Sequence, residues 1–246
     1  MTVAVHVGPE PVPALIDAVR RAGGRVVPLA EAEAIVYYGN DDPGELRSML
    51  HEGISWVQLP HAGVERWADA GVITEHPVFT AATGSYGGPV AEHALALMLA
   101  AARELPRAAV LPRARYRDAL PEADYVVVAA PATPGTRGMF GAYEFGLMKP
   151  DAWLVNVARG GLVVTGDLVE ALRAGRIGGA ALDVTDPEPL PDGHPLWSLE
   201  NVLITPHSAN PRPAYWRGLA ERVTANVRRF ADGEPLEGVV SPARGF

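Results

Sequence analysis

Short apolar runs alternate with segments of helical periodicity along the first hundred residues. The apolar runs predict strands and the segments between them predict helices. The predicted strands are 3–7, 25–29, 34–38, 54–59 and 78–82, and the predicted helices are 12–22, 44–52 and 90–105. This alternation is typical of an α/β domain built on a parallel sheet.

The same rhythm returns after residue 121. The predicted strands are 125–129, 153–157, 180–184 and 202–205, and their β-branched residues indicate parallel strands buried on both faces. A helix is predicted over 166–174, with Thr165 as its N-cap and Gly175 just past its end. An amphipathic helix over 213–230 is expected to pack back on the first domain.

The two halves are separated by a segment without clear periodicity. Helix 90–105 is apolar on nearly every face, so we expect it at an interface between layers or subunits. Residues 106–120 are rich in Arg, Pro and Ala, which favours a linker or a deletion scar. We therefore predict one domain from 1–105 together with 212–246, and a second from 121–211.

Composition narrows the function classes. The chain has 246 residues, 48% of them hydrophobic, a formal net charge of −8 and no cysteine. An acidic chain with scattered basic residues is a poor nucleic-acid binder, and the absence of thiols excludes disulfides and thiolate metal sites. Neither a metal site nor a membrane span is predicted, and we expect a soluble cytoplasmic protein. Lys149 is the only lysine and lies in a turn, so there is no phosphate-loop lysine.

Three short motifs each follow a predicted strand of the second half. They are Asn-Val-Ala-Arg-Gly-Gly at 156–161, Asp-Val-Thr-Asp-Pro-Glu-Pro at 183–189 and Thr-Pro-His at 205–207. Ligands bind at the carboxyl ends of parallel strands, where the motifs place Arg159, Glu188 and His207. A guanidinium holds a carboxylate, an imidazole transfers a proton, and a neighbouring carboxylate fixes its tautomer. Each residue alone is as readily explained by a turn or a cap, but together they suit a 2-oxo or 2-hydroxy acid.

These motifs resemble the signatures of the D-isomer-specific 2-hydroxyacid dehydrogenases, a family that includes phosphoglycerate dehydrogenases and hydroxypyruvate–glyoxylate reductases. Further matches in the family's order lie at 61–64, 89–93, 131–138, 147–150 and 235–240. The resemblance implies an α/β fold with a flavodoxin-like substrate domain (1–105 with 212–246) and a Rossmann-type parallel-sheet domain (121–211).

The resemblance also implies hydride transfer between NAD or NADP and a small 2-oxo or 2-hydroxy acid. By this similarity His207 would protonate the carbonyl oxygen, Glu188 would be its carboxylate partner and Arg159 would orient the substrate. The implied cofactor-binding residues are Pro131, Thr133, Thr136, Val157, Ala158, Asp183, Ser208 and Ala209. The implied substrate-facing residues are Ala62, Gly63, Ser85, Tyr86 and Gly87.

One expected family motif is missing. No two glycines in the sequence are separated by a single residue, so no G-x-G-x-x-G exists. Two βαβ units sharing a strand need about 60 residues, far more than 106–120 supply. We therefore expect a truncated Rossmann domain that lacks most of its first half. Cofactor binding should suffer more than catalytic geometry, because the missing turn would hold the pyrophosphate.

The missing first half of the Rossmann domain would expose a strand and leaves two functions open. Strand 125–129 would become a sheet edge with unpaired backbone groups, so we expect a homodimer or aggregation through this strand. The chain is either a dehydrogenase with impaired activity, or an inactive family member that acts as an interaction or carboxylate-binding protein. A cofactor-independent hydrolase is disfavoured because the chain has no G-x-S-x-G motif.

Overall fold

A computed structural model describes residues 2–101 and 115–243. The chain divides into two compact units. The first comprises Met1–Gly87 with Pro211–Phe246, and the second comprises Gly88–Asn210.

The first unit is built on a five-stranded parallel sheet with the order β2-β1-β3-β4-β5. Its strands are β1 (Ala4–Pro9), β2 (Arg25–Val26), β3 (Ala34–Tyr38), β4 (Trp56–Gln58) and β5 (Val78–Thr80). This order is the flavodoxin-like arrangement of a doubly wound sheet. The predicted flavodoxin-like domain is confirmed.

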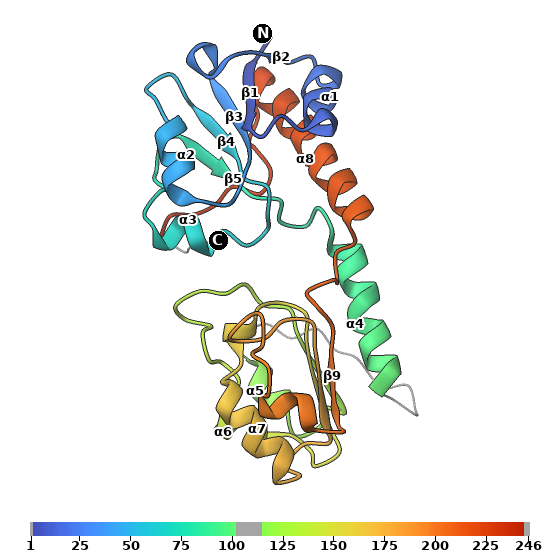
Figure 1. Ribbon diagram of the computed structural model, residues 1–246. Coiled ribbons are helices and arrows are strands. Elements are labelled where there is room, and N and C mark those ends of the chain that lie inside the picture. Colours follow the sequence, from blue (N-terminus) through green and yellow to red (C-terminus); the bar gives the residue numbers. More distant parts are fainter. Residues whose placement is uncertain (1, 102–114, 244–246) are drawn as a thin grey trace. The chain divides into compact units, whose positions relative to one another are not determined.

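Helices cover both faces of this sheet (Figure 1). They are α1 (Pro13–Arg21), α2 (Pro43–Met49), α3 (Glu65–Asp69) and α8 (Arg212–Asp232), with a 3₁₀ turn η1 (Leu29–Glu31). On one face, Leu219 and Val223 of α8 share a core with Leu15 and Val19 of α1. The prediction that the C-terminal helix packs on the first domain is confirmed, because its apolar stripe is buried there.

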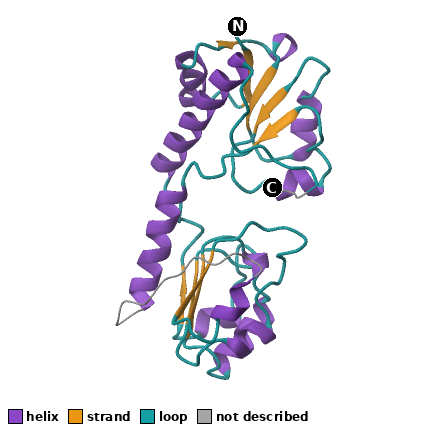
Figure 2. Cartoon of the chain, turned by 180° about the vertical axis from the view of Figure 1, so that it is seen from behind, coloured by secondary structure: helices purple, strands orange, loops and turns teal. Residues whose placement is uncertain are grey.

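The second unit contains four parallel strands in the order β6-β7-β8-β9. They are β6 (Tyr125–Val128), β7 (Trp153–Asn156), β8 (Gly179–Leu182) and β9 (Val202–Ile204). The helices are α4 (Gly87–Ala101), α5 (Tyr116–Ala119), α6 (Ala142–Leu147) and α7 (Thr165–Arg173), with 3₁₀ turns η3 (Gly160–Leu162) and η4 (Pro195–Ser198). Figure 2 shows α6 and α7 together on one side of the strands.

Burial of the four strands differs from the expectation that all would be covered on both faces. Every residue of β8 is buried, but β6 and β9 are only partly buried, because within the described residues each has a strand neighbour on one side only. Val127 of β6 is 40% exposed. The described part of the chain thus leaves β6 at a sheet edge, and dimerisation through it stays a prediction.

The domain boundary also differs from the expected one. Helix α4 belongs almost wholly to the second unit, because Ala94, Leu97 and Met98 share an apolar core with strands β7 and β8. Its Leu95 and Leu99 are about half exposed in the single chain, at 50% and 48%, so the expected interface with a second subunit stays a prediction. An apolar helix without a polar face carries no signal of which sheet it packs against.

The predicted linker or deletion scar at 106–120 lies partly outside the described residues, which resume at Arg115. From there the chain is ordered rather than linker-like. Helix α5 is anchored by the Tyr116 hydroxyl, which donates to the Met139 carbonyl at 2.8 Å. The Tyr116 ring also packs on Phe140 with 5.4 Å between centroids.

Helix α7 begins one residue earlier than expected, with Val164 rather than Thr165 as its N-cap. The Thr165 hydroxyl instead donates to the Asp186 carbonyl at 2.6 Å and ties the helix to the loop after β8. Gly175 has a φ of 61° just past the helix end, as predicted, because a left-handed residue there favours glycine.

Glu144→Ala is expected to lower the free energy of unfolding by about 1–2 kcal/mol in urea titration, because Glu144 caps α6. Its Oε2 accepts from Gly141 N–H at 3.1 Å, and its Oε1 accepts from Arg117 at 2.6 Å. Burial alone would raise the pKa of Glu144, but these hydrogen bonds lower it. The contribution of Glu144 to the free energy of unfolding is therefore fully present above the ordinary glutamate pKa. It is lost as the pH falls through the lowered pKa of Glu144.

The matched control is Glu170→Ala, which removes a carboxylate that is 77% exposed and lies 3.6 Å from Arg173. Its cost should stay within about 0.5 kcal/mol. Equal losses in the two variants would contradict the capping role of Glu144.

Candidate active site

His207 and Glu188 form a close pair after β9 and β8. His207 Nδ1 lies 2.6 Å from Glu188 Oε1, and the two side chains are 49% and 42% exposed. A carboxylate only accepts hydrogen bonds, so the tautomer assigned to His207 carries a proton on Nδ1. This arrangement leaves Nε2 as the ring atom that can exchange a proton with a substrate.

The backbone of His207 is held in an unusual conformation by Asp183. His207 has a φ of 50°, and its N–H donates to the Asp183 carbonyl at 2.9 Å. The fully buried Asp183 side chain accepts hydrogen bonds from Ser208 N–H at 2.9 Å, Ala209 N–H at 3.0 Å and the Thr205 hydroxyl at 2.5 Å. The loop that carries His207 is therefore wrapped around one buried carboxylate.

Arg159 lies on a turn after β7 that the buried Asn156 closes. Asn156 Nδ2 donates to the Arg159 carbonyl at 2.9 Å, and Ala158 N–H donates to Asn156 Oδ1 at 3.1 Å. The Arg159 guanidinium donates to the Ala158 carbonyl at 2.7 Å. Asn156 stands in the first motif, but its structural role was not deduced from the sequence.

Gly160 joins this turn to the loop after β8. A Cβ atom at Gly160 would lie 1.9 Å from the carbonyl oxygen of Thr185, so only glycine fits there. The two loops are thus in direct backbone contact. Within the second unit, the structure brings the Arg159 turn, the Glu188 loop and the His207 loop to the same end of the sheet, as predicted for residues that follow parallel strands.

The remaining implied cofactor residues have defined surroundings in the second unit. After β6, Thr133 N–H donates to Thr136 Oγ1 at 2.7 Å, and the Thr136 hydroxyl donates to the Pro131 carbonyl at 2.7 Å. This loop is therefore held by its own hydrogen bonds. Val157 is buried, and its side chain packs in the core under α4, so only its backbone remains for a ligand.

The implied substrate residues all belong to the first unit. Ala62 N–H donates to the Tyr86 hydroxyl at 2.6 Å, which joins the loop after β4 to the loop after β5. The Ser85 carbonyl lies against α8, where a Cβ at Gly218 would approach it to 2.2 Å. Ser85 Oγ is buried without a hydrogen-bond partner in the described part of the chain. Gly63 and Gly87 flank these contacts along the chain.

A histidine–aspartate pair beside the Ala62 loop was not predicted. His61 Nε2 lies 3.1 Å from Asp41 Oδ2, and the His61 ring stacks on Trp67 with 6.3 Å between centroids. His61 begins segment 61–64, one of the matches to the dehydrogenase family, whereas Asp41 lies in no motif. Nearby, burial raises the pKa of Tyr215 above its ordinary value, so this phenol is neutral at physiological pH.

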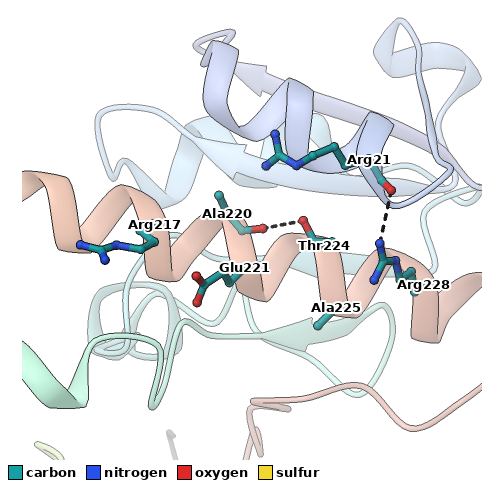
Figure 3. A pocket seen from close by; sticks show the side chains of 7 residues that line it. All are labelled: Arg21, Arg217, Ala220, Glu221, Thr224, Ala225 and Arg228. Carbon is teal, nitrogen blue, oxygen red and sulfur yellow. Dashed lines mark hydrogen bonds between the residues drawn. The ribbon is translucent and has the colours of Figure 1, made fainter.

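A hollow of about 450 Å³ lies between α1 and α8 in the first unit (Figure 3). Its lining residues are Arg21, Arg217, Ala220, Glu221, Thr224, Ala225 and Arg228. None of the predicted site residues lines it. Arg228 donates to the Arg21 carbonyl at 3.4 Å, as a cation at the end of α1 is expected to do.

Two absences hold for residues 2–101 and 115–243. No group of three or more His, Asp or Glu residues is arranged to hold a metal ion there. No helix in these ranges is both long and apolar enough to cross a bilayer.

Comparison with known proteins identifies the family. Residues 100–209 match the family described as D-isomer specific 2-hydroxyacid dehydrogenase, NAD binding domain. An uncharacterized protein from Corynebacterium melassecola is 49% identical over 125 residues, which cover 51% of this chain and 41% of that protein. A glyoxylate reductase from Thermococcus gammatolerans is 45% identical over 115 residues, which cover 47% of this chain and 34% of that enzyme. Residues 100–209 thus belong to the D-isomer-specific 2-hydroxyacid dehydrogenase family.

The chain spans between about a third and two fifths of the length of these curated relatives. Its fold is similar to that of a D-isomer specific 2-hydroxyacid dehydrogenase from Xanthobacter autotrophicus Py2, whose crystal structure contains NADPH and MES. The TM-score is 0.83 at 24% identity, and the alignment covers 100% of both chains. The predicted α/β fold class is confirmed. An alignment over both full lengths does not show the expected internal truncation, which stays a prediction.

Proposed function

We propose that the chain reduces a small 2-oxo acid to the 2-hydroxy acid, with NADH or NADPH as the hydride donor. The observation that carries this proposal is the 2.6 Å contact between His207 Nδ1 and Glu188 Oε1 at the carboxyl end of a parallel sheet. Relatives named glyoxylate reductase and glyoxylate reductase/hydroxypyruvate reductase support a small substrate of this class. The match of residues 100–209 to the NAD binding domain of the D-isomer-specific 2-hydroxyacid dehydrogenases supports the proposed cofactor.

His207 is the proton donor in this proposal. Protonated at both nitrogens, its ring gives the Nε2 proton to the carbonyl oxygen as that oxygen gains negative charge. Glu188 accepts the Nδ1–H bond throughout, which orients the ring and stabilises the imidazolium. The pair is half exposed, so solvent can reprotonate Nε2 after each turnover.

Arg159 is proposed to bind the substrate carboxylate. Its planar guanidinium can hold two carboxylate oxygens at once, which fixes the orientation of the adjacent carbonyl group. The turn that carries it is closed by Asn156 and packed against the Thr185 backbone through Gly160. In the first unit, Ala62, Gly63, Ser85, Tyr86 and Gly87 remain the proposed substrate-facing residues.

The second unit fits the nicotinamide end of the cofactor. Asn210 Oδ1 is buried without a hydrogen-bond partner in the described residues, and a nicotinamide carboxamide offers a donor for such an acceptor. Ser208, Ala209 and the 157–158 backbone would line this end, and the loop of Pro131, Thr133 and Thr136 would lie along the cofactor. When bound, NAD(P)H supplies the hydride. Asp183 is fully buried, so it would act by holding the Ser208–Ala209 backbone.

The absent glycine motif favours a second candidate. Without G-x-G-x-x-G, the amide cradle that commonly holds a pyrophosphate is not encoded in this sequence. The alternative is an inactive family member that keeps the Arg159 turn for binding a carboxylate ligand or a partner protein.

Titration of the full chain with NADH and NADPH separates the two candidates. Energy transfer from tryptophan to the bound nicotinamide reports binding, and the dehydrogenase proposal predicts saturation in the micromolar range. Absence of saturation in a sample with a cooperative unfolding transition would favour the inactive, carboxylate-binding candidate. Repeating the titration with glyoxylate or hydroxypyruvate present tests whether substrate and cofactor bind together.

A further inference from the structure

We infer that His93 of α4 is a positioning residue for His207, acting through Thr205 and the buried Asp183 carboxylate. The inference rests on the proposed function, because it assigns His93 a role in the geometry of the proposed proton donor. His93 ends segment 89–93, one of the matches to the dehydrogenase family, but no local pattern in the sequence indicates what its side chain contacts.

His93 reaches the His207 loop from a distant part of the sequence. Its Nε2 lies 3.0 Å from Thr205 Oγ1 and 3.3 Å from Asp183 Oδ1, and its side chain is 21% exposed. His93 and Thr205 are 112 residues apart, so this contact joins α4 directly to the end of β9. All three residues lie within the second unit.

The direction of these hydrogen bonds follows from counting protons. The Thr205 hydroxyl has a single proton and lies 2.5 Å from Asp183 Oδ1, which as a carboxylate oxygen can only accept. That proton therefore points at Asp183, and Thr205 Oγ1 presents a lone pair to His93. His93 must then carry its proton on Nε2, a tautomer assigned from these contacts. His93 thus keeps the Thr205 hydroxyl directed at the carboxylate.

Asp183 links the Thr205 hydroxyl to the backbone around His207 through hydrogen bonds. Its carbonyl accepts the His207 N–H, and its carboxylate accepts the N–H groups of Ser208 and Ala209, which follow directly. His207 has a φ of 50°, a conformation that persists only when surrounding contacts enforce it. If the hydrogen bonds between the Asp183 carboxylate and this loop weaken, His207 should adopt other backbone conformations. It should then lose its contact with Glu188.

The burial of Asp183 gives the His93 N–H a second role. A buried carboxylate is costly unless hydrogen-bond donors compensate it. His93 Nε2 lies 3.3 Å from Asp183 Oδ1, so its N–H dipole lies next to this carboxylate as well as to Thr205. A donor at this position therefore supports the orientation of the carboxylate.

Two His93 variants of the full chain separate positioning from packing. His93→Phe keeps a ring but removes the donor, whereas His93→Gln places an amide N–H₂ near the position of Nε2. His93→Phe is expected to shift the His207 ring ¹⁵N resonances and to raise amide exchange at Ser208 and Ala209 about tenfold, the effect of losing one hydrogen bond. His93→Gln should restore both readouts to within about twofold of the unmodified chain.

Glu92→Gln is the matched control, because it changes the neighbouring, exposed residue of α4 and should alter neither readout. Unchanged His207 resonances and exchange rates in folded His93→Phe would overturn the inference, and so would equal changes in His93→Phe and His93→Gln. Neither readout needs cofactor or turnover. Failure of NAD(P)H binding would therefore count against the proposed function and leave this result intact. In an active chain, His93→Phe should lower kcat more than it raises KM.

Discussion

His207→Ala is expected to lower kcat for reduction of a 2-oxo acid by about 10²–10⁴-fold, the usual contribution of a positioned general acid. Cofactor affinity and thermal stability should change little, because the ring is half exposed and its hydrogen bond to Glu188 lies at the surface. Steady-state oxidation of NADH with glyoxylate measures the rate, and tryptophan energy transfer measures the affinity.

His51→Ala is the control for this substitution. His51 is an exposed histidine of the first unit whose Nε2 lies 3.0 Å from the Leu29 carbonyl, outside every predicted site. The kcat of the His51→Ala variant should stay within about twofold of that of the unmodified chain. A His207→Ala variant that is as active as the His51→Ala variant would remove His207 from the proposed mechanism.

Gly160→Ala is expected to lower the free energy of unfolding by about 3 kcal/mol or more. A methyl group there would overlap the Thr185 carbonyl oxygen, and two backbone segments cannot relax as a flexible side chain can. The Arg159 turn would separate from the loop that carries Glu188, so activity should fall as well. Urea unfolding followed by circular dichroism measures the loss.

The adjacent glycine provides a matched control. A Cβ at Gly161 would meet its nearest neighbour, Asp186 Oδ2, at 3.6 Å, which is an ordinary contact distance. Gly161→Ala should therefore change the free energy of unfolding by less than about 1 kcal/mol. Equal losses at the two positions would show that the backbone approach at Gly160 does not determine stability.

Strands were predicted well because short apolar runs identify them locally. Strand β3 spans Ala34–Tyr38, as predicted, and the other eight strands of residues 2–101 and 115–243 fall within or close to their expected ranges. Helices α3, α5 and α6 were not predicted, since four to six residues are too few to establish a helical period. The domain boundary was misplaced because α4 lacks a polar face to indicate which side is covered.

The residues of the candidate site could likewise be predicted where local motifs mark them, but not where they depend on contacts between distant segments. Arg159, Glu188 and His207 could be placed at strand ends from motifs and the rule for parallel sheets. The contact of His93 with Thr205 and that of Gly160 with Thr185 could not, because each joins segments far apart in the sequence. Asp183 is fully buried and organises the loop around His207, and its expected contact with the cofactor stays a prediction.

Hydride transfer by this chain is tested directly by following deuterium from the reduced cofactor to the substrate. The full chain is incubated with glyoxylate and with NADH or NADPH deuterated at the nicotinamide C4, and the glycolate formed is analysed by mass spectrometry. We expect glycolate with deuterium on C2, formed by the unmodified chain and lost in the His207→Ala variant. Absence of labelled glycolate from a folded chain that binds the cofactor would contradict this expectation.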